Sequence, residues 1–235
     1  FLWTHNTAIG MNNPNPGSGS YAYSSDDYAK YNRTGGVGTK SASNGNNNSI
    51  PSGKIASGQA FFIEASSGVA TKAIIFNNSM KVKGENNNNQ IFRQTVAPIV
   101  TNFTINANET ETLIEKNRIW INVSNNQGAF NQMLLGYISG ATDGFDNGFD
   151  GKTFEAGNYI GIYSILDDYQ LSIQGRSLAF DENKEIPLGF KNTIGGNFTI
   201  ELENFDGFFQ NQNVYLLDKE TQILTNLKEI KYNFQ

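Results

Sequence analysis

Short runs of alternating residues constrain the fold of this chain more than any other feature. Ile119, Ile121 and Val123 share one side of an extended backbone, whereas Trp120 and Asn122 share the other. The same period of two recurs at 159–163, 171–173, 198–202 and 214–217. Each run is rich in β-branched or aromatic residues and is bounded by Gly, Asn or Asp, a pattern typical of strands separated by turns. Helical periodicity is almost absent, so we predict an all-β fold: an antiparallel, jelly-roll-like β-sandwich.

The domain organisation is expected to be either one composite sandwich or two packed β units. We predict an N-terminal β unit over 1–95, a connector over 96–112 and a C-terminal β-sandwich unit over 113–235. Within the first unit, 11–53 is rich in Asn, Gly, Ser and Pro and predicts long, ordered but irregular loops. Short strands are expected at 61–63 and 74–76. In the second unit, Asp167-Asp168 falls between two strands, where a hairpin turn is expected.

Charge and cysteine content exclude several classes of protein. Only 17% of the residues are charged, the net charge is -5 and the basic residues are scattered, so the basic footprint of a nucleic-acid-binding protein is missing. There is no long apolar run, so no membrane-inserted helix is expected. The chain has no cysteine, which removes disulfides and thiolate chemistry. A surface of Asn, Ser, Thr and Gly suits an extracellular protein.

Catalytic candidates are few. His5 is the only histidine, so a histidine-assisted nucleophile would have to be built around it. Zinc sites usually need several nitrogen or sulfur ligands, which this chain does not offer. We therefore predict that the chain is not an enzyme.

An Asp-rich segment, DGFDNGFDG at 143–151, is the strongest chemical signal. Calcium takes six to eight oxygen ligands, and Asp143, Asp146, Asn147 and Asp150 offer several within one glycine-rich loop. The spacing is not that of an EF-hand. The alternative is a turn in which the Asp and Asn side chains bond their own backbone, and a third is a glycosidase carboxylate pair. A calcium ion is the only cofactor predicted.

Aromatic residues outside the strand pattern suggest a second kind of site. Tyr21, Tyr23, Tyr28 and Tyr31 lie in or beside the predicted loops and are candidates for stacking on sugar rings. The alternative is that these tyrosines pack a long loop onto the body of the protein.

Several segments in series resemble one family. They are FLWTHNT (1–7), IASGQAFFI (55–63), FNNSM (76–80), GYISGATDGFD (136–146), IQGR (173–176), PLGFK (187–191) and VYLLDK (214–219). Together they are similar to the β-rich region just upstream of the C-terminal sorting domain in large flavobacterial proteins exported by the type IX secretion system.

The resemblance implies a Bacteroidota origin, transit through the periplasm and an extracellular or outer-membrane-surface location. Its hosts include adhesin-like and gliding-motility proteins, and the type IX machinery is the implied partner during export. Cell-surface components or glycans are further partners to expect. The favoured hypothesis is a non-catalytic structural or adhesive surface module. The alternatives are a carbohydrate-binding module, with or without stabilising calcium, and part of a secreted glycan-degrading enzyme.

Overall fold

The computed structural model describes 28–39, 114–126, 129–154 and 159–235, shorter pieces at 50–51, 53, 55, 61, 73 and 75–80, and the main chain of 2–3. The strands are β1 (Leu2–Trp3), β2 (Tyr28–Tyr31), β3 (Gly36–Val37), β4 (Lys116–Asn125), β5 (Phe130–Ile138), β6 (Gly151–Lys152), β7 (Ile160–Leu166), β8 (Tyr169–Arg176), β9 (Leu188–Asn192), β10 (Phe198–Phe205), β11 (Tyr215–Asp218), β12 (Ile223–Asn226) and β13 (Tyr232–Phe234). Two short 3-10 turns, η2 (Asn78–Met80) and η4 (Gly207–Gln210), are the helical elements of this described part. None of its helices is long and apolar enough to cross a membrane. The all-β prediction is confirmed.

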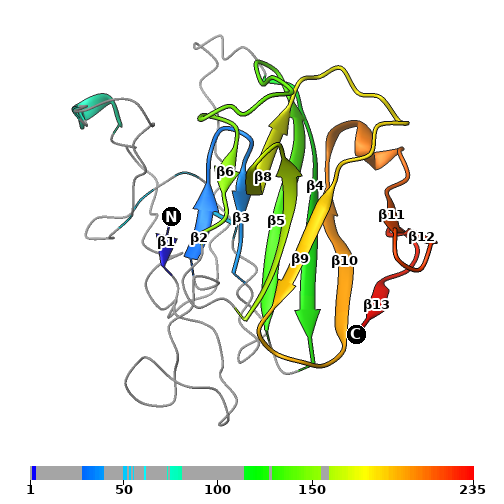
Figure 1. Ribbon diagram of the computed structural model, residues 1–235. Coiled ribbons are helices and arrows are strands. Elements are labelled where there is room, and N and C mark those ends of the chain that lie inside the picture. Colours follow the sequence, from blue (N-terminus) through cyan, green and yellow to red (C-terminus); the bar gives the residue numbers. More distant parts are fainter. Residues whose placement is uncertain are drawn as a thin grey trace, which may run out of the picture.

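One large sheet forms the body, in the order β13-β10-β4-β5-β8-β7-β9, with β6 beside β8 (Figure 1). Its pairings are antiparallel except for β5 and β8, which run parallel over Leu134↔Ile173 to Tyr137↔Arg176. The sheet is therefore mixed, unlike the purely antiparallel sandwich predicted. A parallel pair needs a long crossover connection, and the chain between β5 and β8 supplies one.

The inner face of this sheet holds the main core. Ile119, Ile121 and Val123 of β4 pack with Ile160 and Ile162 of β7, because the outer part of the sheet folds back over its centre. The alternation seen in the sequence thus marks a buried face.

The folded-back sheet is closed by aromatic rings. Phe190 of β9 lies 5.0 Å from Phe198 of β10 and 4.9 Å from Phe234 of β13, measured between ring centroids. The two edge strands, β9 and β13, therefore meet through side chains, which gives a curled, sandwich-like body.

The other face of the sheet carries the β2–β3 hairpin. Val37 of β3 packs with Trp120, Leu134 and Ile173, which come from β4, β5 and β8. Figure 1 shows this hairpin lying beside β5 and β6, on the opposite side of the molecule from β11 and β12.

Local predictions met different outcomes. The alternating runs lie in or overlap β4, β7, β8, β10 and β11, and Asp167-Asp168 forms the β7–β8 turn. The strand predicted at 74–76 was wrong for its described residues: Ile75 and Phe76 belong to no strand and are 70% and 69% exposed. An apolar run becomes a strand only where another strand pairs with it, which local sequence does not reveal.

Candidate functional site: the upper end of the sheet and the Asp-rich loop

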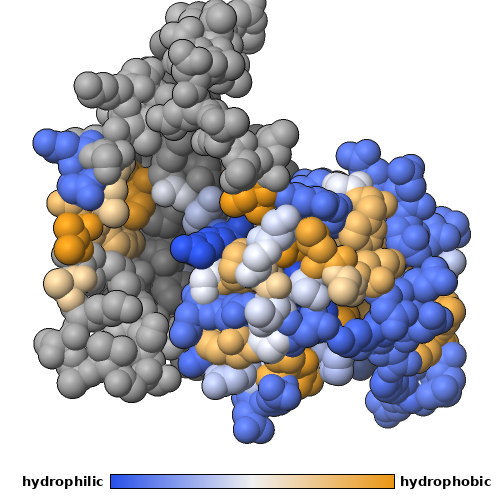
Figure 2. Space-filling view, turned by 90° about the horizontal axis from the view of Figure 1, so that it is seen from above, coloured by the Kyte–Doolittle hydropathy of each residue, from blue (hydrophilic) through white to orange (hydrophobic). Residues whose placement is uncertain are grey.

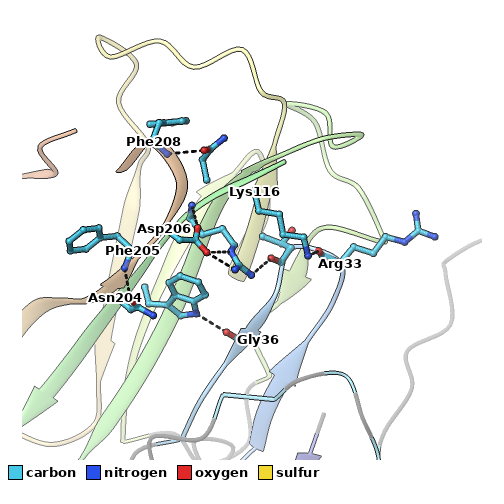
Figure 3. Close-up of polar contacts among 11 residues, drawn as sticks. Arg33, Gly36, Lys116, Asn204, Phe205, Asp206 and Phe208 are labelled. Atoms are coloured by element: carbon cyan, nitrogen blue, oxygen red, sulfur yellow. Dashed lines mark hydrogen bonds and ion pairs between the residues drawn. The ribbon is translucent and has the colours of Figure 1, made fainter. Parts of the chain in front are cut away.

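Functional groups gather at the upper end of the sheet, which we define as the end where β4 begins at Lys116 and β5 ends at Ile138. The side chains of Lys116, Arg118 and Trp120 project from the same face of β4, because they alternate with the core residues. Each donates a hydrogen bond to a main-chain carbonyl of the 33–36 segment. Lys116 Nζ lies 3.0 Å from the oxygen of Arg33, Arg118 Nη1 3.1 Å from that of Thr34, and Trp120 Nε1 2.8 Å from that of Gly36 (Figure 3).

Arg118 is the centre of this arrangement. Its Nε and Nη2 donate to Asp206 Oδ2 at 2.9 and 2.5 Å, and its backbone N–H donates to Asp206 Oδ1 at 2.8 Å. The guanidinium also lies 4.8 Å from the Trp120 ring. Asp206 follows β10 and precedes η4, so this one ion pair joins β4, the hairpin and η4 (Figure 3).

Buried amides continue the pattern along β4. Asn122 is fully buried; its Nδ2 donates to Glu203 and its Oδ1 accepts from Gln132 Nε2 at 2.7 Å. Gln132 Oε1 in turn accepts the backbone N–H of Gly38. The chain of amides connects β10, β4 and β5 to the end of the hairpin, and each amide has its donor and acceptor used.

In the Asp-rich loop the predicted ligands do not converge on one point. Asp150 is buried, and its two carboxylate oxygens accept the N–H groups of Gly175 at 2.9 Å and Asp146 at 2.6 Å. Asp146 Oδ2 accepts the N–H of Thr142, while Asn147 is exposed. The loop thus has the backbone-bonded organisation named above as the alternative to calcium. Among the described residues no group of three or more His, Cys, Asp or Glu side chains is placed to hold a metal ion. Calcium binding stays a prediction.

Asp150 carries the largest electrostatic perturbation of the loop. Burial raises its pKa to about 6, and the charge of Asp146 acts in the same direction. The hydrogen bonds from the Asp146 and Gly175 N–H groups and the charge of Arg176 oppose the rise. The two hydrogen bonds from the main chain, one from its own loop and one from Gly175, hold the loop against β8.

The same loop fastens the hairpin. The Phe149 carbonyl accepts Asn32 Nδ2 and Thr34 Oγ1, both at 2.7 Å, and the Gly148 carbonyl accepts the N–H of Arg33. Gly175 lies under this junction, where an added Cβ would come within 2.7 Å of both Phe149 Cβ and Thr34 Oγ1. The hairpin, loop and β8 therefore meet at a point that only glycine fits.

Asp143 turns away from its neighbours in the loop. Its carboxylate binds Lys184 Nζ at 3.1 Å, buried Arg176 Nη2 at 3.3 Å and the Ser177 hydroxyl at 3.0 Å. Burial alone would raise the pKa of Asp143, but the hydrogen bonds from Lys184 and Ser177 and the charge of Arg176 outweigh it and lower the pKa. Asp143 therefore stays ionised and ties the loop to the 177–187 segment.

Aromatic side chains fill the upper end beside these charges. Tyr137 lies 5.1 Å from Phe180 and 5.9 Å from Phe208, and Phe180 lies 4.6 Å from Phe208. Burial is the main cause of the raised pKa of Tyr137. Seen from above, hydrophobic residues interrupt the hydrophilic surface at this end (Figure 2).

Two of the four tyrosines predicted to bind a ligand lie among the described residues. Tyr21 and Tyr23 lie outside the described residues. Tyr28 is half-buried, with its ring edge-on to Phe154 at 5.4 Å, so it helps pack the hairpin. Tyr31 is 46% exposed and is the one of the described pair open to a ligand.

Sequence reasoning missed Arg118, Asp206 and Arg176. The position of Arg118 in β4 offered one signal, since it shares the face of Trp120 and Asn122. No local signal pairs Asp206 with Arg118, because 88 residues separate them.

Comparison with known proteins gives one match. The model of the family described as "Domain of unknown function (DUF8693)" matches residues 1–235. No curated protein and no solved structure matches the chain.

Proposed function

We propose that this chain, which belongs to the DUF8693 family of domains of unknown function, is a non-catalytic structural or adhesive module of an extracellular protein. The observation that carries the proposal is the use of its carboxylates. Asp143, Asp150 and Asp206 each accept hydrogen bonds that hold distant segments together. A general acid or base must instead be within reach of a substrate proton. These carboxylates serve to keep loops and hairpin in place.

A rigid upper end suits a module that presents an adhesive surface, or holds neighbouring domains, outside the cell. The hairpin is tied to the sheet through β4, through the buried amides and through the Asp-rich loop, so three independent sets of contacts resist its detachment. Low charge and abundant Asn and Gly support an extracellular setting. The resemblance to the region upstream of type IX sorting domains supports export by that system, through the periplasm, to the cell surface or medium.

The test is surface display. The full chain is placed between a reporter protein and a type IX sorting domain in a bacterium that has the system. The reporter on intact cells is then quantified with an antibody. We expect display of the intact fusion, and reduced display with increased proteolysis for Asp206→Ala, which loosens the hairpin. The control is the reporter joined directly to the sorting domain.

Two results would contradict the proposal. Hydrolysis of a glycan or peptide by the purified chain would show that it is an enzyme. Equal display and protease resistance of Asp206→Ala and the unchanged chain would show that the tied hairpin has no part in the role.

Carbohydrate binding is the second candidate function, favoured by aromatic surfaces with polar neighbours. Phe145 and Tyr169 stack at 4.3 Å with Lys152 Nζ 5.4 and 5.1 Å from their ring centroids, and Tyr31 is exposed. An exposed aromatic ring with a polar end, such as that of Tyr31, is the kind of group that packs against a sugar ring. A glycan array with the purified chain tests this. Binding lost in Tyr31→Ala or Tyr169→Ala would support it, and an array without signal would reject it.

A further inference from the structure

The Asp-rich loop contains an asparagine followed by a glycine, Asn147-Gly148. The chain has one other such pair, Asn44-Gly45, which lies outside the described residues. In this dipeptide the glycine nitrogen can reach the side-chain amide carbon of the asparagine, because glycine has no Cβ to obstruct the approach. The two groups belong to one chain, so the reaction between them depends on whether the fold leaves them free to meet.

The fold leaves both reacting groups of this pair free. Asn147 is exposed, and within the described part of the chain no hydrogen bond is made by its side-chain amide or by the Gly148 N–H. The next two N–H groups are bound, since those of Phe149 and Asp150 donate to the Asp146 carbonyl at 3.0 and 2.7 Å. The hydrogen bonds that hold the turn therefore do not engage the nitrogen that must react.

A positive charge lies beside this nitrogen. Arg33 Cδ, Nε and Nη1 lie 3.5, 3.6 and 3.7 Å from the position that a Cβ on Gly148 would take. The Arg33 N–H donates to the Gly148 carbonyl at 3.0 Å, which fixes the two residues side by side. Figure 3 shows the Arg33 side chain pointing away from Lys116, which binds the Arg33 carbonyl. A nearby positive charge favours the deprotonated amide nitrogen, which is the nucleophile in this reaction.

We propose that Asn147 deamidates spontaneously in the folded protein, with the Gly148 nitrogen as the nucleophile and the Arg33 guanidinium assisting it. A bond forms between that nitrogen and Asn147 Cγ, the bond from Cγ to Nδ2 breaks, and ammonia leaves with the amide proton. Water then opens the cyclic imide. Addition of water at Cγ gives aspartate, and addition at the main-chain carbonyl carbon gives isoaspartate. Nothing is oxidised or reduced, and water is the only co-reactant.

Isoaspartate at this position releases the hairpin from the loop. It adds one carbon to the main chain between Asp146 and Gly148, inside the turn that the Phe149 N–H closes on the Asp146 carbonyl. The two carbonyls that follow, those of Gly148 and Phe149, are the ones that bind the hairpin. The added carbon displaces both carbonyls from their donors. The inference is independent of the proposed function, because it requires neither export nor a partner.

The experiment is peptide mapping by mass spectrometry of the full folded chain after days in mildly alkaline buffer. We expect aspartate and isoaspartate to accumulate at position 147. Gly148→Ala should slow this by at least about tenfold, because its methyl group obstructs the nitrogen. The variant should fold, since the added Cβ makes only ordinary contacts with Arg33. Arg33→Met should slow the reaction about threefold, because a charge near the surface acts weakly through water. Asn44-Gly45 is the internal control, and its deamidation should be the same in all three proteins.

Release of the hairpin is measured by hydrogen exchange of the Arg33 N–H, the donor to the Gly148 carbonyl. Exchange should be at least about tenfold faster in the purified isoaspartate form than in Asn147→Asp, which carries the same charge on an ordinary main chain. An Asn147 that stays intact in the folded chain overturns the proposal, as does a rate unchanged in Gly148→Ala or in Arg33→Met. Equal exchange in the isoaspartate form and Asn147→Asp overturns the release of the hairpin.

Discussion

Removal of the Asp206 carboxylate should loosen the hairpin as well as destabilise the fold. In Asp206→Ala the Arg118 backbone N–H loses its acceptor and the guanidinium loses both of its hydrogen bonds to Oδ2. An unsatisfied, poorly hydrated N–H costs about 1–3 kcal/mol. The Arg118 and Asp206 side chains are 22% and 32% exposed, so their ion pair is neither fully exposed nor fully buried. Its loss should therefore cost more than the about 0–1 kcal/mol of an exposed pair and less than the loss of one partner of a buried pair. We therefore expect a loss of about 2–4 kcal/mol in the free energy of unfolding.

Asp206→Asn separates the two contributions. Its amide keeps one oxygen that can accept the Arg118 backbone N–H, whereas its NH2 group cannot accept from the guanidinium. The ion pair and its two hydrogen bonds are therefore lost but the backbone N–H keeps its acceptor, and the expected cost falls to about 1–2 kcal/mol. The assay is urea unfolding of Asp206→Ala, Asp206→Asn, Arg118→Met and the double variant Arg118→Met/Asp206→Ala. A double-mutant cycle built from the two single variants and the double should give a coupling energy of about 1–2 kcal/mol.

A local signal should accompany the loss of stability. The Trp120 Nε1–H donates to Gly36 and its ring contacts the Arg118 guanidinium. The indole N–H of Trp120 should therefore exchange with solvent faster in Asp206→Ala. Lys219→Met is the control, because the Lys219–Glu185 pair is also a close one, at 2.7 Å, but its side chains are 71% and 63% exposed. It should cost less than about 0.5 kcal/mol. A coupling energy near zero, with unchanged indole exchange, would refute the role given to this ion pair.

Three further perturbations address the Asp-rich loop. Because the pKa of Asp150 rises from 3.8 to about 6 on folding, its contribution to stability is fully present below pH 3.8 and is lost as the pH rises through 6. Relative to Asp150→Asn, the free energy of unfolding of the unchanged chain should thus fall by about 3 kcal/mol between pH 3.8 and pH 7, as measured by urea unfolding. Free energies of unfolding that vary with pH in the same way in both proteins would contradict this. Gly175→Ala should destabilise by about 2–3 kcal/mol, because its Cβ would meet Phe149 and Thr34, whereas Gly195→Ala, where nothing lies within 4 Å, should change little in the same thermal melts. If the loop binds calcium, adding calcium to chelator-treated protein at about a hundredfold excess over Kd should raise the free energy of unfolding by roughly 2.7 kcal/mol. Asp146→Ala should abolish this gain. A thermal unfolding transition that does not change at millimolar calcium would reject the site.

The local sequence pattern predicted a buried strand face and a turn. The alternation at 119–123 placed Ile119, Ile121 and Val123 on a buried face, because a strand exposes successive residues to opposite sides. The turn at Asp167-Asp168 was likewise predictable, since Asp tolerates the positive φ of 51° that Asp167 adopts. Both features depend only on neighbouring residues.

The use made of each polar side chain was decided by tertiary structure. Asp143, Asp146, Asn147 and Asp150 are close in sequence and lie in one loop. The position of β8 determines that Asp150 binds the Gly175 N–H. Asp143 instead binds Arg176 and Lys184, which lie outside the loop. The parallel pairing of β5 with β8 and the meeting of Arg118 with Asp206 have the same origin. Strand register joins residues far apart in the chain, and no local periodicity encodes which strand a given strand will pair with. The sequence by itself thus determined that this chain is a β protein and where several of its strands and the Asp167-Asp168 turn lie. Long-range packing determined which strands pair and which charges meet.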